Sequence, residues 1–320
     1  MYGQQPTAFI ASWKKVVSAV RAAAGPNNVA FIWAPNSANG YPYLKSTHSV
    51  TVNSSKWDPS LDTNGDGKFD KLDDPFSSFY PGDEWVDWVG MSLYHYGDRF
   101  PWTRNTVPIP GEAERIILGT SNGQTPFNFY RMFCGDGFGG KPFSQSQGGK
   151  PMIITETAAT IHVAGIVINP RGTPNFVPVN QCPECRAQIK QTWWRQIINA
   201  TFLEEYPKIK AVSFFEFFKF EETTWRDFTI FGGDGNLTSP ENDDGAAMNN
   251  LTLIALQRDM NGDMGRLVQW AQPGSFGTIY GSATRNVTGS TPPNSQNPQN
   301  SAILSFNYPL LLMLALCFIF

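Results

Sequence analysis

Charged residues are scarce in this chain of 320 residues, and they do not gather into a basic stripe. They make up 16% of the sequence, and the formal net charge is -3. Binding to nucleic acid depends on clustered lysine and arginine side chains that neutralise phosphates and release counterions. The charge pattern therefore argues against a nucleic-acid partner.

Cysteine is also scarce, and no export signal opens the chain. Cys317 lies in an apolar C-terminal tail, which leaves Cys134, Cys182 and Cys185. Cys182 and Cys185 could pair with each other or with another cysteine, and a single disulfide leaves one thiol over, which is unusual for an exported protein. Met1 is followed by YGQQPTAF, without the basic residue and apolar stretch of a signal peptide. We therefore expect that the true N-terminal part is missing from this sequence.

The C-terminal end and the glycosylation sequons indicate an exported protein. Residues 310–320 form an unbroken apolar tail, and Asn300 begins a run of small residues upstream of it. This layout is typical of a GPI-attachment signal, whereas a tail-anchored helix would need roughly 20 apolar residues. Residues 281–302 are rich in Ser, Thr, Asn and Pro and predict a stalk, followed by the hydrophobic tail 303–320. Asn-x-Ser/Thr sequons begin at Asn53, Asn199, Asn236, Asn250 and Asn286. We expect an extracellular, GPI-anchored monomer at the cell surface, with the anchor near Asn300.

Short apolar strands alternate with helices along the first 280 residues. Strands are predicted at 29–33, 88–94, 151–156 and 211–217, and helices at 6–24, 112–133 and 183–206. This alternation predicts an α/β domain with a parallel sheet. Polar residues, among them Asn36, Tyr94, Glu156 and Glu216, stand at or just after the strands. In parallel α/β folds the C-terminal ends of the strands carry the functional site.

The segment DTNGDGKFDKLD matches the spacing of an EF-hand-type calcium loop. Gly67 falls at the sharp turn of that loop, and Asp rather than Glu stands at its last ligand position. The oxygen donors would be Asp62, Asn64, Asp66, the backbone carbonyl of Lys68, Asp70 and Asp73. A solvated turn is the alternative, since Asn-Gly and Asp-Gly also favour tight turns. Because Pro75 stops a long exiting helix, we expect a structural Ca²⁺ clip rather than a calcium switch.

Several segments together resemble glycoside hydrolase family 26, over about residues 2–260. They are YGQQPTAFIASWKKVV, FIWAPN, FYPGDEWVDWVGMSLYHYG, KPMIITETA and WRDF. Members of this family are chiefly endo-β-1,4-mannanases with a (β/α)8 barrel, and fungal relatives include GPI-anchored ones. The resemblance implies a TIM-barrel-type domain, residues 1–280, of which this chain holds strands five to eight.

The resemblance also implies roles for individual residues. Glu156 matches the nucleophile of a retaining double displacement, and Tyr94 matches the tyrosine that orients it. Trp225 and Arg226 match residues that line the sugar sites, and Trp33 and Asn36 would face the same cleft. The substrate would be a β-mannan or related β-glycan.

The second catalytic carboxylate of such an enzyme is not found. A retaining glycosidase needs an acid/base carboxylate roughly 5–5.5 Å from the nucleophile. In the family that the chain resembles, this is a Glu in a His-Glu-x-Asn-Gly-like segment at the end of strand four. No His-Glu or Asn-Glu pair occurs in this chain. Glu216, Glu221 and Glu222 are weak substitutes, so we expect negligible hydrolysis by the chain as given. The alternative function is a non-catalytic, carbohydrate-binding surface protein.

Overall fold

The computed structural model describes residues 4–25, 28–44, 49–98, 104–121, 126–135, 149–168, 174–178, 183–222, 224–230 and 246–268. All of these except Val268 belong to one unit of the chain, which comprises residues 1–267 and 316–320. The expected stalk, residues 281–302, and the tail, residues 303–320, lie outside the described residues. Within the described ranges, no helix combines the length and the apolar character that a membrane crossing requires.

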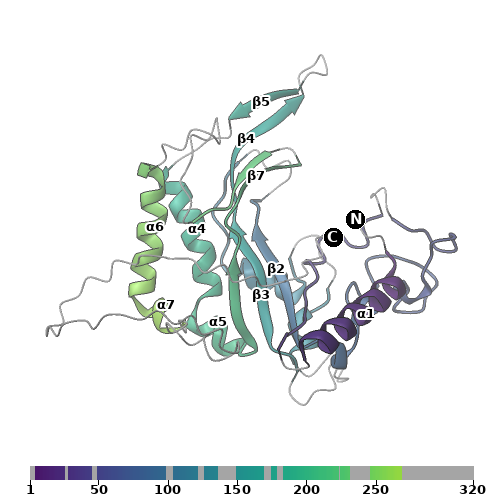
Figure 1. Ribbon diagram of the computed structural model, residues 1–320. Coiled ribbons are helices and arrows are strands. Elements are labelled where there is room, and N and C mark those ends of the chain that lie inside the picture. The colour runs from purple at the N-terminus through teal and green to yellow at the C-terminus, as the bar shows by residue number, and fades with distance from the viewer. Residues whose placement is uncertain are drawn as a thin grey trace, which may run out of the picture. The chain divides into compact units, whose positions relative to one another are not determined.

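Four parallel strands form the central sheet, as the alternation of strands and helices predicts. They are β1 (Ile32–Trp33), β2 (Trp88–His95), β3 (Met152–Ala159) and β6 (Ile209–Phe214). Their order is β1-β2-β3-β6, and all neighbours run parallel (Figure 1). The α/β class is therefore confirmed. In the described part of the chain this sheet is open, with β1 and β6 at its two edges.

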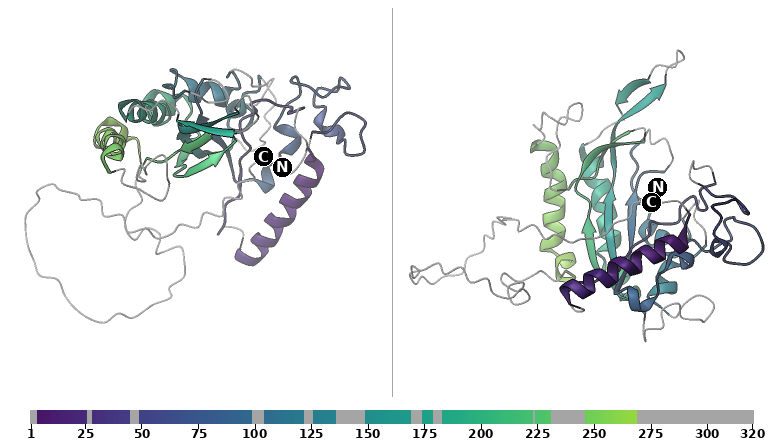
Figure 2. Two further views of the ribbon diagram at one scale, coloured as in Figure 1. Left: turned by 90° about the horizontal axis from the view of Figure 1, so that it is seen from above. Right: turned by 45° about the vertical axis from the view of Figure 1, so that its right-hand side comes forward.

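Helices cover the sheet and connect its strands. They are α1 (Pro6–Ala24), α2 (Glu112–Leu118), α3 (Phe129–Phe133), α4 (Pro183–Ile197), α5 (Ala200–Glu205), α6 (Ala246–Asn261) and α7 (Asp263–Arg266). Helix α4 contacts both β3 and α6. Helices α4 and α6 run side by side (Figure 2). A buried carboxylate on α6, Asp259, accepts hydrogen bonds from Trp194 Nε1 at 2.9 Å and Arg195 Nη2 at 2.6 Å on α4. Helix α6 is thereby fixed as the outer layer over α4.

The first helix has the predicted bounds, whereas two longer predicted helices are each divided. Trp13 and Val17, four residues apart, are the buried face of α1, and Gly25 ends it at φ 83°. Gly119, at φ 68°, closes α2 well before α3 begins. Asn199 interrupts the predicted helix 183–206, because its side chain accepts the N–H of Phe202 at 3.2 Å and starts α5. Glycine and asparagine at these places favour helix ends over helix interiors.

A second, antiparallel sheet was not predicted from the sequence. It consists of β4 (Ile161–Ile168), β5 (Pro174–Pro178), β7 (Phe218–Glu221) and β8 (Thr224–Asp227), in the order β5-β4-β8-β7. Strand β4 begins two residues after β3 ends. The second sheet therefore rises directly from the C-terminal ends of the parallel strands (Figure 1).

Candidate functional site

Glu156 is the one residue of β3 that is not buried. Strand β2 pairs Met91 with Ile154 and then Ser92 with Glu156, so that Thr155 is an extra residue in the ladder. The pairing of β3 with β6 is irregular over the same stretch. A bulge of this kind bends the strand and changes the direction of the following side chain. It explains how a carboxylate escapes burial in a strand that is otherwise apolar and covered.

Gly90 makes room for this bulge on the neighbouring strand. A Cβ atom at Gly90 would lie 2.7 Å from Thr155 Cγ2 and 2.9 Å from the carbonyl oxygen of Ile153. Ala34 is also close, with its Cβ at 3.1 Å. Such distances are shorter than van der Waals contact, so only glycine fits here without movement of β3. The sequence Val-Gly-Met in β2 is thus coupled by packing to the position of Glu156.

Gly90→Ala should therefore destabilise the protein by about 1–3 kcal/mol, the usual cost of overpacking a core. The measurement is the free energy of unfolding in urea. Gly262→Ala is the matched control, because its new Cβ would meet no atom closer than 3.5 Å. Adding Thr155→Ser to Gly90→Ala removes the nearest methyl group and should restore part of the loss. Equal stability of the two alanine variants would contradict this account of the bulge.

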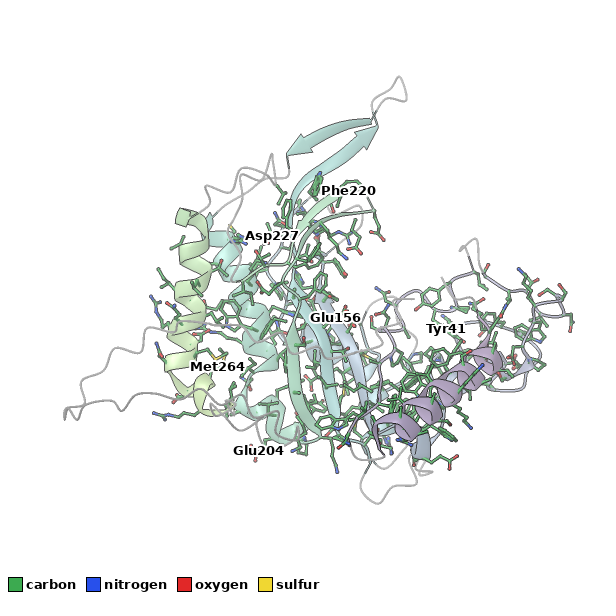
Figure 3. The ribbon with its side chains drawn as sticks, viewed as in Figure 1. Tyr41, Glu156, Glu204, Phe220, Asp227 and Met264 are labelled. Atoms are coloured by element: carbon green, nitrogen blue, oxygen red, sulfur yellow. The ribbon has the colours of Figure 1, made fainter. Side chains whose placement is uncertain are left out.

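Tyr94 binds the carboxylate of Glu156 directly. The Tyr94 hydroxyl donates a hydrogen bond to Glu156 Oε2 at 3.0 Å. In the view of Figure 3, Glu156 lies below Phe220 and Asp227 of the antiparallel sheet. Burial, followed by the charge of Glu156, raises the pKa of Tyr94. The phenol therefore keeps its proton and acts as a donor to the carboxylate. This is the contact that the family resemblance predicts for these two residues.

Asn36 lies on the same row across the sheet, whereas Trp33 does not belong to the site. Asn36 forms an isolated parallel bridge with Ser92, which in turn pairs with Glu156. Trp33 is only 2% exposed. Its ring centroid lies 5.1 Å from that of Tyr80 and 5.0 Å from that of Phe133. The prediction that Trp33 faces a sugar-binding cleft is corrected here, because aromatic packing encloses the ring.

Arg226 lies near Tyr94, on the neighbouring ring of Tyr96, but its guanidinium is occupied by ion pairs within the hairpin. Its guanidinium donates to Glu221 Oε2 at 2.6 Å and to Glu222 Oε2 at 2.7 Å. The guanidinium also lies 5.0 Å above the ring of Tyr96, and the Tyr96 ring lies 5.4 Å from that of Tyr94. Arg226 is buried. In this structure it is a cross-link between the β7–β8 hairpin and the end of β2.

Trp225 lies on the opposite face of the hairpin. Its ring stacks on Phe218 at 5.4 Å and meets Phe220 edge-on at 5.6 Å. Successive side chains of a strand point to opposite faces. Trp225 and Arg226 therefore project from opposite faces of the hairpin.

The glutamates considered as substitutes for the missing acid have other partners. Glu216 accepts the N–H of Ile230 with both oxygens, at 2.8 and 2.9 Å, and so closes the base of the hairpin. Glu221 is paired with Arg226 and also with Lys219, at 3.3 Å. Both carboxylates therefore serve as hydrogen-bond or ion-pair acceptors within the hairpin.

A buried ionic cluster supports the hairpin from behind, and sequence reasoning missed it. Asp227 accepts hydrogen bonds from Arg186 of α4, one of them from Nε at 2.9 Å. Lys190 donates to the carbonyl oxygens of Ala159 and Asp227, both at 3.1 Å. Burial opposes the charge of Asp227, but Lys190, Arg186 and hydrogen bonds from Thr229 outweigh it and lower its pKa. Arg186 and Lys190, one turn apart on the helix face that also carries Ile189 and Trp193, were the available signal.

The predicted calcium loop is closed by hydrogen bonds between its side chains and its backbone. Asp62 accepts the N–H groups of Gly65 and Gly67, both at 2.8 Å. Asp73 is fully buried and accepts from Thr63 N at 2.8 Å and Asp70 N at 2.9 Å. Over the described ranges, no group of three or more His, Cys, Asp or Glu side chains converges as metal ligands would. The first and last predicted ligands thus belong to one closed loop, with their oxygens turned to backbone donors.

The cysteines differ in state. Cys185 is disulfide-bonded, whereas Cys134 is a free, buried thiol. Burial raises the pKa of Cys134 to about 12, so that the thiolate is not formed near neutral pH. Cys134 packs at the end of α3 as a small apolar side chain and offers no nucleophile.

Comparisons with known proteins add no relative. No family model matches the chain, and no curated protein matches it either. The candidate site therefore rests on the geometry of the chain itself: a carboxylate freed by a bulge within β3, a tyrosine bound to it, and a hairpin fixed above both by Arg226 and Asp227.

Proposed function

We propose that this chain is part of a retaining β-mannan hydrolase and that Glu156 is its nucleophile. The observation that carries the proposal is the Tyr94–Glu156 hydrogen bond at a bulge where β3 would otherwise be buried. A carboxylate kept accessible inside a covered parallel strand costs packing, and Glu156 lies in the C-terminal half of β3, towards the strand ends that carry the chemistry of parallel barrels. The four parallel strands would be strands five to eight of a (β/α)8 barrel, and the protein would be anchored outside the cell by a GPI lipid.

The reaction would proceed by double displacement. A Glu156 oxygen attacks the anomeric carbon, the bond from that carbon to the glycosidic oxygen breaks, and the leaving oxygen takes a proton from an acid. Water then attacks the same carbon, releases Glu156 and gives up a proton to the base. Tyr94 would hold the attacking carboxylate in one orientation throughout. Glu216, Glu221 and Glu222 have other partners, so a different carboxylate would have to supply the proton. Natural glycosides should therefore react extremely slowly with this chain.

The experiment uses a substrate that does not need the acid. The substrate is a 2-deoxy-2-fluoro-β-mannobioside that carries 2,4-dinitrophenolate as its leaving group. This leaving group departs without protonation, and the fluorine slows hydrolysis of the glycosyl-enzyme. We expect one equivalent of dinitrophenolate and one glycosyl adduct, which peptide mass spectrometry locates on Glu156. An unlabelled folded protein, or an adduct on another residue, would refute the proposed nucleophile.

A non-catalytic, carbohydrate-binding surface protein is the second candidate. One observation favours it: the rings of Phe218, Phe220 and Trp225 form a partly exposed aromatic face on the hairpin. Aromatic faces that remain accessible in a folded protein often mark ligand contacts. Retarded migration of the protein through a gel that contains soluble mannan, together with no labelling by the activated glycoside, would favour this reading.

We also propose that the 62–73 loop binds a structural Ca²⁺ ion through the predicted oxygen donors. Ligand binding to the native state alone raises stability by about 2.7 kcal/mol at 100 times the dissociation constant. For a domain of this size we expect a rise in melting temperature on the order of 5–10 °C. The measurement is thermal unfolding with Ca²⁺ and with EGTA, and Asp66→Ala should remove the difference. Identical melting curves of the wild-type protein in both conditions would reject the site.

A further inference from the structure

His162 lies at the junction of the two sheets, in contact with both. It belongs to β4, and its side chain is fully buried. Its Nε2 lies 2.6 Å from the carbonyl oxygen of Tyr96, just beyond β2, and its Nδ1 lies 3.0 Å from Thr224 Oγ1 in β8. Asn105 holds the backbone of His162 on both sides, with bonds of 2.8 and 2.9 Å. The imidazole ring is therefore fixed in place by three different segments.

The chemistry of the partners sets the direction of these hydrogen bonds. A carbonyl oxygen only accepts, so Nε2 of His162 carries the proton that points to Tyr96. Thr224 Oγ1 accepts from Arg226 Nε at 3.1 Å, and its own hydroxyl proton can then be given to His162 Nδ1. The result is a relay from Arg226 through Thr224 and His162 to the backbone of Tyr96, with His162 neutral.

Burial of the ring is the main reason why His162 stays neutral. Burial, together with the nearby cation Arg226 and with His95, lowers the pKa of His162 to about 4, although its bond to Tyr96 and the charge of Glu222 act in the opposite direction. In an unfolded chain histidine titrates near 6.5. The neutral ring therefore contributes stability that is present above about pH 6.5 and is lost as the pH falls towards 4.

We propose that His162 and Thr224 are positioning residues for Glu156, because their relay holds Arg226 on the ring of Tyr96. Tyr96 packs on Tyr94, which donates to Glu156. A hydroxyl in the antiparallel sheet thus fixes the orientation of a carboxylate in the parallel sheet. The inference rests on the proposed function, because a positioned carboxylate matters only if Glu156 attacks the substrate.

The first test reads the relay itself by NMR, without any substrate. The chain has three histidines, and loss of one set of ring signals in His162→Gln assigns those of His162. Long-range ¹H–¹⁵N correlations should find Nε2 protonated and Nδ1 bare from pH 8 to about pH 5, as a pKa of about 4 requires. A protonated Nδ1 at pH 7, or titration near 6.5, would overturn the relay whatever the protein does.

The second test uses Thr224→Val, which keeps the shape of the side chain, and Thr224→Ser, which keeps the hydroxyl. Thr224→Val should shift the carboxyl ¹³C signal of Glu156, assigned by its loss in Glu156→Gln, and should slow labelling by the activated glycoside about tenfold. Thr224→Ser should restore both. An unchanged Glu156 signal and labelling rate in Thr224→Val would overturn the positioning role and leave the proposed nucleophile standing. Absence of labelling in the wild-type protein would instead overturn the proposed function, and the role derived from it, even where the ¹³C shift is seen.

Discussion

Glu156→Gln is expected to abolish labelling by the activated fluoro-glycoside, with a loss of more than about 10³-fold in rate. Glutamine has the same size and can still accept the hydrogen bond from Tyr94, but its neutral amide oxygen does not displace the leaving group. Binding of mannan should remain close to that of the wild-type protein, because shape and hydrogen bonding are kept. The measurements are dinitrophenolate release and gel retardation by mannan.

Glu216→Gln is the control for this experiment. Its side-chain oxygen can still accept the N–H of Ile230, and the residue has no part in the proposed reaction, so labelling should persist. Equal loss in both variants would point to general damage rather than to a nucleophile. Retained labelling in Glu156→Gln would contradict the proposed role directly. A protein that binds mannan but is never labelled would be a binding protein, and Glu156 would then be a structural carboxylate that orders Tyr94.

The parallel sheet could be predicted because its signals are local. Apolar runs such as Trp88–Tyr94 and Pro151–Glu156 are short, buried on both faces and separated by helical patterns, and the structure places strands β2 and β3 there. The same holds for α1, because Pro6 at its start and Gly25-Pro26 after its end are recognisable in the sequence. Local patterns of this kind determine which elements exist better than where they end.

The candidate site could be predicted only in part, since its other features depend on long-range packing. The bulge at Thr155 arises from pairing with two neighbouring strands, and no periodicity in the sequence reports it. The antiparallel sheet joins short strands far apart in the chain. Trp33 was assigned to a cleft because it ends a strand, yet three aromatic rings enclose it. A tryptophan at the end of a strand can pack in the core or line a binding face, and only its tertiary contacts determine which of the two occurs.

Asp227→Asn is expected to destabilise the protein by about 3–5 kcal/mol, the usual cost of removing one partner from a buried ion pair. Arg186 and Lys190 are 3% and 2% exposed and would lose the carboxylate that offsets their burial. In a domain of this size the melting temperature should fall by on the order of 10 °C. Asp263→Asn is the matched control. The side chain of Asp263 is 97% exposed and that of its partner Arg266 is 83% exposed, and exposed ion pairs contribute little to stability.

The pH dependence of this effect follows from the lowered pKa of Asp227. A carboxylate whose pKa is lower in the folded than in the unfolded state adds stability above its unfolded pKa, and that stability is lost as the pH falls through the folded value. The stability difference between wild-type protein and Asp227→Asn should therefore be constant near neutral pH and shrink below about pH 4. Because Asp227 adjoins Arg226, the variant should also loosen the hairpin and slow labelling at Glu156. A variant as stable as Asp263→Asn would mean that the hairpin stays in place without its buried ionic support.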